Sequence, residues 1–329
     1  MAYEEIRELV RASGLFARDR PVLVMLSGGR DSSCLTDVAV ALLGPTAVSA
    51  LHVNYGLRER AAAEEGHCVE LCERLGVELE VVRAERSPGA DPAGEGTGGN
   101  LQAWARDIRY AAAAEIAERR DGLIATGHTA SDQAETILYR LAASPGRRAL
   151  LGMPAEEGRL IRPLLEVTRE QTTAYCEERS LSWCDDESNE DERYARARVR
   201  HGLLPELRAV HPAAEANILR TSRLLREETE LLDSLVAEEL AGSKRIAIAR
   251  LREMAPALAR MVVVKLAEHA AGTYVPQAGG RVQEILALGR RGGRAELHVG
   301  GRAGAVIAEG MLEMVRLPPR ASSAPPRED

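Results

Sequence analysis

The sequence predicts an α/β protein with a parallel sheet covered by helices on both faces, followed by a smaller, mainly helical domain. Two observations carry this prediction. Short apolar runs occur at 21–26, 47–53, 77–82 and 122–127, and helical patterns at 32–43, 60–75, 100–119 and 131–142 alternate with them. Strands that alternate with helices of these lengths favour parallel pairing, and ligands of such sheets bind at the carboxyl ends of the strands.

The first strand, PVLVML, ends at a Ser-Gly-Gly turn, and the next helix runs from Ser32 to Leu43. Asn100 is a good N-cap for the helix that follows the Pro/Gly-rich stretch 87–99, which we expect to be a mobile surface loop. A further helix should begin near Thr168. A long helical stretch starts at about 213 and leads to a segment with helical and then strand character up to Arg316.

These elements suggest three segments: a nucleotide-binding domain at 1–212, a second domain at 213–318, and a disordered tail at 319–329. With 329 residues and 45% hydrophobic content, the chain can form two cores. The N-terminal residues are acidic where a signal peptide is basic, and no apolar run is long enough to span a bilayer. We therefore expect a cytoplasmic protein with no membrane partner.

Charge and cysteine content narrow the function classes further. The net charge is -7, but residues 218–320 contain 16 Lys and Arg against 12 Asp and Glu, so this part is the better candidate to face a polyanion. Five cysteines in a chain of this length are too few for a disulfide framework and indicate reduced thiols. His67, Cys68 and Cys72 lack a second ligand pair, and packing explains them better than metal binding.

The strongest motif is Ser27-Gly28-Gly29-Arg30-Asp31-Ser32, between the first strand and its helix. Glycines allow the backbone to approach an anion, the start of the helix offers unpaired N–H groups, and the serines add hydroxyl donors. The loop therefore suits phosphate, although it lacks the Walker A pattern. The alternative is an ordinary glycine turn.

Two pairs of charged residues are each spaced three apart on a helix. Arg106 and Arg109 can face one side and bind phosphate, whereas Asp132 and Glu135 can hold an ammonium group or Mg²⁺ near the strand ends. His128, just after the fourth strand, can contact phosphate or move a proton. The alternative for each pair is a solvated helix face with salt bridges.

SGGRDS resembles the SGGxDS signature of the PP-loop ATP pyrophosphatases. Further blocks over about 20–210 resemble the tRNA(Ile)-lysidine synthases in particular: HVNYGLR at 52–58, NLQAWARDIRY at 100–110, TGHTASDQAET at 126–136, LGMP at 151–154, RPLL at 162–165, DESN at 186–189 and YARARVR at 194–200. The sequence departs from the family pattern at Tyr55, Thr129, Ser131, Ala143, Ser144 and Ala197. These departures leave the chemical residues in place and affect the expected recognition of the substrate.

The resemblance implies a Rossmann-like PP-loop domain of the adenine nucleotide alpha hydrolase type, and an enzyme that ligates free L-lysine to the wobble cytidine of tRNA(Ile) with a CAU anticodon. ATP would adenylate O2 of the base before the amine attacks C2, giving lysidine, AMP and pyrophosphate. ATP-binding residues would be Ser27, Gly28, Gly29, Arg30, Asp31, Ser32 and His52, with Mg²⁺ at Asp31. Catalytic residues would be Asp31, Arg106, Arg109, His128, Asp132, Glu135 and Arg200.

Contacts with the tRNA would come from Arg193 and Arg196, where a charged surface helix is the alternative, and from the domain at 213–318. A homodimer is a further family expectation. Two rival functions stay open: a tRNA thiolase of the same superfamily, whose relatives usually use C-x-x-C pairs that this chain lacks, and a non-catalytic nucleotide- or RNA-binding relative.

Overall fold

The apolar runs of the sequence become the strands of a central sheet. The computed structural model describes residues 2–16, 19–56, 61–84, 99–143, 146–184 and 195–318, with only the backbone described at 99–102. The expected loop at 87–98 and the expected tail at 319–329 lie outside these residues. Contacts divide the chain into two compact units, Met1–Arg223 and Leu224–Asp329.

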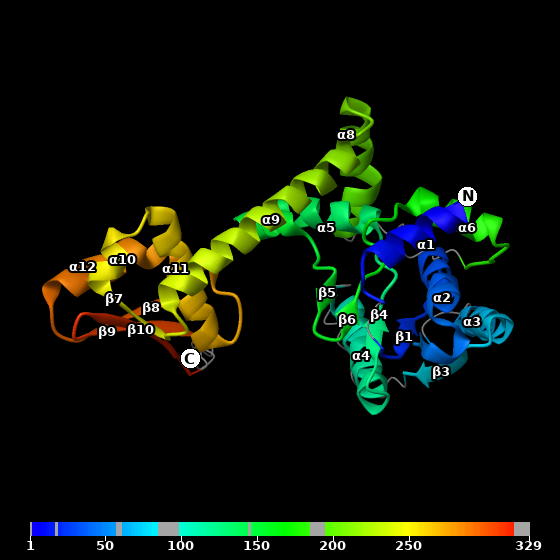
Figure 1. The fold of residues 1–329 in the computed structure, drawn as a ribbon, viewed down its shortest axis with the longest axis horizontal. Coiled ribbons are helices and arrows are strands. Elements are labelled where there is room, and N and C mark those ends of the chain that lie inside the picture. The colour runs from blue at the N-terminus through cyan, green and yellow to red at the C-terminus, as the bar shows by residue number, and fades with distance from the viewer. Residues whose placement is uncertain are drawn as a thin grey trace, which may run out of the picture. The chain divides into compact units, whose positions relative to one another are not determined.

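The first unit alternates strands and helices (Figure 1). Its strands are β1 (Val22–Met25), β2 (Val48–Asn54), β3 (Glu78–Arg83), β4 (Leu123–Ala125), β5 (Glu156–Glu157) and β6 (Leu160–Ile161). Its helices are α1 (Ala2–Ala12), α2 (Arg30–Leu43), α3 (Ala61–Leu75), α4 (Gly99–Arg119), α5 (Ala130–Ala143), α6 (Arg169–Glu178), α7 (Ala195–Arg198) and α8 (Leu204–Val210), with 3-10 turns at Pro45–Ala47 and Arg147–Leu151 and a π-helical turn at Val199–Leu203.

The order of the strands is β3-β2-β1-β4-β6-β5, and all neighbours are parallel except β5 and β6. The chain fills one side of β1 with β2 and β3 and then crosses to place β4 on the other side. The order therefore reverses between β1 and β4. In open parallel sheets a crevice forms at such a point, outside the carboxyl ends of the strands.

Alternate residues of each strand enter different cores, as expected for a sheet with helices on both faces. In β1, Val22 and Val24 pack with residues of α1, α2, α3 and α6, whereas Leu23 and Met25 pack against α4. Strands β1, β2 and β4 are buried from both sides, which explains why they read as continuous apolar runs. The predicted parallel sheet with two covered faces is confirmed.

Most of the predicted elements occur within one or two residues of their predicted ends, the usual uncertainty of helix boundaries. Two starting points were wrong. The helix after β1 begins at Arg30, because Gly29 is its N-cap, and α4 begins at Gly99, so Asn100 lies inside the helix. The helix near Thr168 was predicted correctly: Thr168 caps α6 and forms a capping box with Gln171.

The second unit combines helices with an antiparallel sheet in the order β7-β10-β9-β8. Helix α9 (Ala214–Leu240) spans the boundary between the units. The other elements are β7 (Arg245–Ala247), α10 (Ile248–Glu253), α11 (Pro256–Ala271), a 3-10 turn at Pro276–Arg281, α12 (Val282–Arg291), β8 (Ala295–Gly300), β9 (Ala303–Ala308) and β10 (Met311–Arg316). One apolar core joins its helices to the sheet. Within the described ranges, no helix combines the length and the apolar character needed to cross a membrane.

Candidate functional site

The loop that joins β1 to α2 is held in shape by its own serines. Ser32 Oγ donates to Gly29 O at 2.8 Å and lies 3.2 Å from the Ser27 amide and 3.1 Å from Ser27 Oγ. Gly28 has φ +84°, a conformation that strongly favours glycine. The loop therefore presents the start of α2, with the unpaired N–H groups of its first turn, at the carboxyl end of β1.

His52 supports the base of this loop from β2. Its ring is buried, and Nδ1 lies 3.0 Å from Leu26 O, at the residue that precedes Ser27. The same nitrogen lies 3.4 Å from Cys68 Sγ. One ring nitrogen of His52 is therefore hydrogen-bonded to the backbone at the base of the loop. His52 thus helps to hold the loop on which phosphate would bind.

Gly127 brings the loop after β4 against the phosphate loop. A Cβ atom at this position would lie 3.1 Å from the carbonyl group of Asp31 and 3.1 Å from Ser32 N. Such distances are tighter than ordinary van der Waals contact, so the two backbones touch. This contact places His128 and the start of α5 next to Asp31.

The carboxylate of Asp132 is oriented by the first turn of α5. Its Oδ2 atom accepts bonds from the Thr129 amide and from Thr129 Oγ1, both at 2.9 Å. The Asp132 amide points back to Thr129 Oγ1 at 3.4 Å, which gives the reciprocal pattern of a capping box. Oδ1 is left to face the site. Thr129, which replaces a histidine of the family pattern, thus has a structural role.

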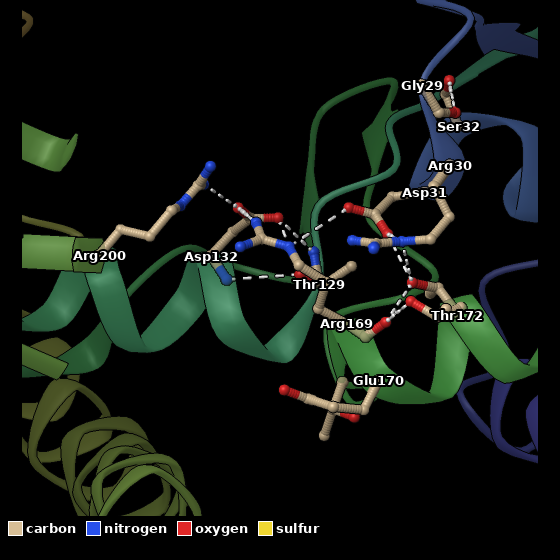
Figure 2. A network of polar contacts seen from close by, with 12 residues as sticks. Gly29, Arg30, Asp31, Ser32, Thr129, Asp132, Arg169, Glu170, Thr172 and Arg200 are labelled. Carbon is tan, nitrogen blue, oxygen red and sulfur yellow. Dashed lines mark hydrogen bonds and ion pairs between the residues drawn. The ribbon is translucent and has the colours of Figure 1, made fainter. Parts of the chain in front are cut away.

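Arg200 is paired with both carboxylates of α5, and Figure 2 shows it beside Asp132. It makes a two-pronged contact with Glu135, with Nε 2.6 Å from Oε1 and Nη2 3.0 Å from Oε2, and Nη2 also lies 3.4 Å from Asp132 Oδ1. The Glu135 side chain is only 4% exposed. The structure therefore brings Arg200 to a carboxylate pair more than 60 residues earlier in the sequence, and here Arg200 neutralises the carboxylates.

Helix α6 contributes two residues that the sequence analysis missed. Thr172 is buried and donates to Asp31 Oδ1 at 2.5 Å, and Arg30 Nε lies 3.2 Å from the same oxygen. Arg169, in the first helical turn, reaches Asp132 Oδ1 at 3.2 Å. Their signal in the sequence was the capping Thr168, which fixes the start of the helix, but no motif indicated that this helix faces α2 and α5.

His128 is neutral near pH 7. Burial lowers the pKa of His128 to about 4, the nearby Asp132 carboxylate raises it, and the positive fields of Arg162, Arg106 and Arg109 lower it. Nδ1 lies 2.8 Å from Thr126 Oγ1. The imidazole can therefore offer hydrogen bonds to a ligand, and it brings no positive charge.

Arg106 and Arg109 lie on α4, and both guanidinium groups approach the ring of Tyr110, at 4.5 Å and 5.8 Å from its centroid. Tyr55, another departure from the family pattern, donates to Ala105 O at 2.9 Å and so ties α4 to the end of β2. Both arginines lower the pKa of His128, so their charges lie near enough to act on that residue.

The two residues expected to contact RNA are described unequally. Arg196 lies exposed on α7, and Arg193 lies outside the described residues. Burial lowers the pKa of Arg140, and the positive charges of Arg196 and Arg162 lower it further, so these three arginines are near one another. This concentration of positive charge suits a polyanion.

Among the residues that the structure describes, no cluster of three His, Cys, Asp or Glu side chains could hold a metal ion. Asp31 fits Mg²⁺ in another way, because magnesium in nucleotide sites is commonly held by one or two carboxylates together with substrate phosphates. None of the five cysteines forms a disulfide, and Cys68 and Cys72 are buried in the core, as the packing interpretation predicted.

Known proteins resemble this chain in sequence and in fold. The model of the PP-loop domain matches residues 2–207. The tRNA(Ile)-lysidine synthase of Pseudomonas fluorescens is 39% identical over 224 residues, 66% of this chain and 48% of that protein, and the one of Salinispora arenicola is 39% identical over 72% of this chain and 73% of that protein. The chain spans about half the length of several of the curated relatives it matches.

A solved structure supports the fold independently. The U34-tRNA thiolase NcsA from Methanococcus maripaludis superimposes with a TM-score of 0.57 at 20% identity, over 68% of this chain and 79% of that chain. This likeness concerns the fold alone. On the matched domain and the 39% identity that covers 73% of the Salinispora protein, the chain belongs to the tRNA(Ile)-lysidine synthase family of PP-loop proteins.

Proposed function

We propose that the chain ligates L-lysine to C2 of the wobble cytidine of a CAU-anticodon tRNA(Ile), at the expense of ATP. The observation that carries the proposal is the position of Asp31, which stands between a phosphate loop and two carboxylates of α5 at the point where the strand order reverses. A nucleotide and a cationic amine could therefore bind next to each other.

In the first step, ATP binds with its phosphates on Ser27–Ser32, and O2 of the cytidine attacks the α-phosphorus. The new O–P bond forms as the bond to pyrophosphate breaks. Asp31 would hold Mg²⁺, which neutralises phosphate charge when bound. Arg106 and Arg109, stacked on Tyr110, would add positive charge from α4, and neutral His128 would donate or accept a hydrogen bond.

In the second step, the lysine ε-amine attacks C2, AMP leaves with O2, and the nitrogen loses a proton. Asp132 is the better carboxylate to receive the ammonium group, since its side chain is 22% exposed and its Oδ1 faces the site. Glu135 is almost fully buried and its two oxygens already accept bonds from Arg200. We assign Glu135 to hold Arg200 and Asp132 to position the amine.

The tRNA would be held mainly through its backbone and unpaired anticodon bases. Arg196 is exposed and Arg140 is half-buried near it, so the two offer a positive surface in the first unit, and Arg193 remains a candidate from sequence. Residues 218–320 carry an excess of basic side chains and provide a second surface.

The experiment is ATP-dependent transfer of radiolabelled lysine to an unmodified CAU-anticodon isoleucine tRNA. We expect label in the RNA, and its loss in Asp31→Asn, which keeps the size of the side chain and removes its charge. Asp121→Asn is the matched control. Asp121 lies before β4, at the amino end of that strand, and its side chain is 77% exposed. Its φ of 47° suits asparagine.

Each other outcome favours one of the alternative functions. Pyrophosphate release with tRNA but without lysine transfer would refute the amine as substrate and favour the thiolase alternative, which is then tested with sulfide as the nucleophile. Binding of tRNA or ATP without pyrophosphate release would favour the non-catalytic alternative.

A further inference from the structure

The first turn of α6 forms a third side of the site, opposite the phosphate loop and α5. Figure 2 shows Arg169 pointing from this turn toward Asp31 and Asp132. Its guanidinium group lies 3.2 Å from Asp132 Oδ1, 3.7 Å from Glu135 Oε1 and 3.9 Å from Asp31 Oδ2. Within the described part of the chain, it is the side chain whose ion pairs reach all three carboxylates.

The three carboxylates need a positive charge between them. Two unit charges 4 Å apart interact with about 4 kcal/mol at the effective dielectric typical of a protein surface, so like charges at such distances would push the side chains apart. Arg169 offsets this repulsion. It also lies 3.9 Å from Asp31, a member of the phosphate loop, so its charge reduces the repulsion between the carboxylates and a triphosphate bound on that loop.

Arg169 is held more loosely than Arg200. Arg200 makes a two-pronged pair with Glu135 at 2.6 and 3.0 Å, the geometry of a strong guanidinium–carboxylate contact. Arg169 makes one hydrogen bond, at 3.2 Å, and its other two ion pairs are longer than a hydrogen bond. Both arginines share Asp132 Oδ1. A cation that approaches Asp132 therefore competes first with Arg169.

We propose that Arg169 is a positioning residue that serves the two substrates in opposite ways: it favours nucleotide binding and competes with the substrate ammonium for Asp132. This inference rests on the proposed function, since it takes the second substrate to be a free amine. Loss of the guanidinium charge leaves three carboxylates that repel ATP more strongly and attract an ammonium group at least as well. A residue with only a structural role would weaken both ligands together.

The test uses the full chain with Arg169→Gln, which removes the charge and retains a polar side chain, and Arg169→Lys, which keeps the charge. Calorimetry measures the affinity for a non-hydrolysable ATP analogue with Mg²⁺ and, separately, for lysine in the presence of that analogue at saturation. Arg74→Gln is the control, because Arg74 donates to Ser180 O at 3.1 Å and has no contact with the site.

We expect Arg169→Gln to lower the affinity for the ATP analogue about tenfold or more, which corresponds to about 1.4 kcal/mol. The affinity for lysine should be unchanged or increased. Arg169→Lys should bind the analogue more tightly than Arg169→Gln, and Arg74→Gln should match the wild type.

An equal loss of affinity for both ligands in Arg169→Gln, or an unchanged affinity for the analogue, would refute the role of Arg169. Failure of the wild type to bind or transfer lysine would instead refute the proposed function, and the amine half of this inference with it. If Arg169→Gln does not fold, Arg169→Met decides, because it also removes the charge: it should weaken binding of the analogue and leave binding of lysine unchanged or stronger.

Discussion

At the scale of single residues, Gly127 decides how closely β4 and α2 approach each other. An added Cβ atom would lie 3.1 Å from backbone atoms of Asp31 and Ser32, and backbone cannot move aside as a flexible side chain can. We expect Gly127→Ala to lower the free energy of unfolding by about 1–3 kcal/mol, the cost of overpacking, and to weaken ATP binding. Denaturant unfolding and nucleotide titration measure both effects.

Gly66→Ala is the matched control for this substitution. Gly66 lies in α3, and a Cβ atom there would have no neighbour within 4 Å. Alanine in the middle of a helix should stabilise the protein by about 0.5–1 kcal/mol. An equal effect of the two substitutions would contradict the importance of the close approach at Gly127.

The lowered pKa of His128 predicts how the stability of the protein depends on pH. In the unfolded chain the group titrates near 6.5, whereas in the folded protein burial lowers its pKa to about 4. Between these values the unfolded state binds a proton that the folded state does not bind, so acidification favours unfolding. The contribution of His128 to stability should therefore fall as the pH drops from about 6.5 to about 4, and be constant above pH 7.

His128→Gln removes this titration and retains a polar side chain of similar reach. The difference in unfolding free energy between the two proteins, measured at several pH values, should shift against the wild type below pH 6.5. Proton NMR of the His128 ring gives the folded pKa directly. A His128 resonance that titrates near 6.5 would contradict the lowering of its pKa by burial.

The sequence indicated the charged residues of the site better than their partners. Asp31, Asp132 and Glu135 were found because carboxylates beside a phosphate loop suggest chemistry. Thr129 and Tyr55 read as departures from a family pattern, yet each makes specific local bonds: one caps α5 and the other anchors α4. Such roles depend on which backbone atom lies nearby, and motif spacing does not give that information.

At the scale of elements, α6 is positioned by one buried carboxylate. Asp37 of α2 is 2% exposed and accepts bonds from Tyr175 Oη at 2.6 Å and from Arg179 Nε at 2.9 Å. Burial and the Asp37 carboxylate raise the pKa of Tyr175, so the hydroxyl stays protonated and can donate. These bonds fix α6 against α2, and with it Arg169 and Thr172 at the site.

We expect Asp37→Ala to lower the free energy of unfolding by about 3–5 kcal/mol, because a guanidinium and a buried hydroxyl would lose their acceptor. The two tryptophans of the chain, Trp104 and Trp183, both belong to the first unit, so their fluorescence follows its unfolding. Asp121→Asn, which changes an exposed ion pair, should cost under about 1 kcal/mol. Similar losses in the two variants would show that the buried network does not anchor α6.

Local signals defined the start of α6 but not its position. The sequence Thr168-x-x-Gln171 predicted the cap, and the bonds between the two residues are present. The packing of α6 on α2 depends on Asp37, Tyr175 and Arg179, residues separated by about 140 positions, and a single sequence does not reveal such pairing. The short strands β5 and β6 were also missed, since two residues give no periodic pattern.

At the scale of the whole molecule, every described residue of the site belongs to the unit Met1–Arg223. The sequence predicted this concentration, because all its motifs precede residue 201. It also predicted helical and then strand character in the second unit, where the apolar runs of β8, β9 and β10 alternate with turns rather than helices. What pattern could not supply is the order of the strands, which is set by crossovers between segments far apart in the chain.

This division of residues predicts a division of binding properties. A fragment of residues 1–223 contains the phosphate loop, the three carboxylates and α6, so it should bind an ATP analogue within about threefold of the full chain.

The same fragment lacks the excess of basic residues at 224–320. We expect its affinity for CAU-anticodon tRNA to fall about tenfold or more, a loss of about 1.4 kcal/mol, and its tRNA binding to depend less steeply on salt, since fewer phosphate contacts release fewer counterions. Tryptophan fluorescence establishes that the fragment is folded before either titration. Equal tRNA affinity of the folded fragment and the full chain would assign RNA binding to the first unit alone, and would leave the arginines near Arg196 as its main positive surface.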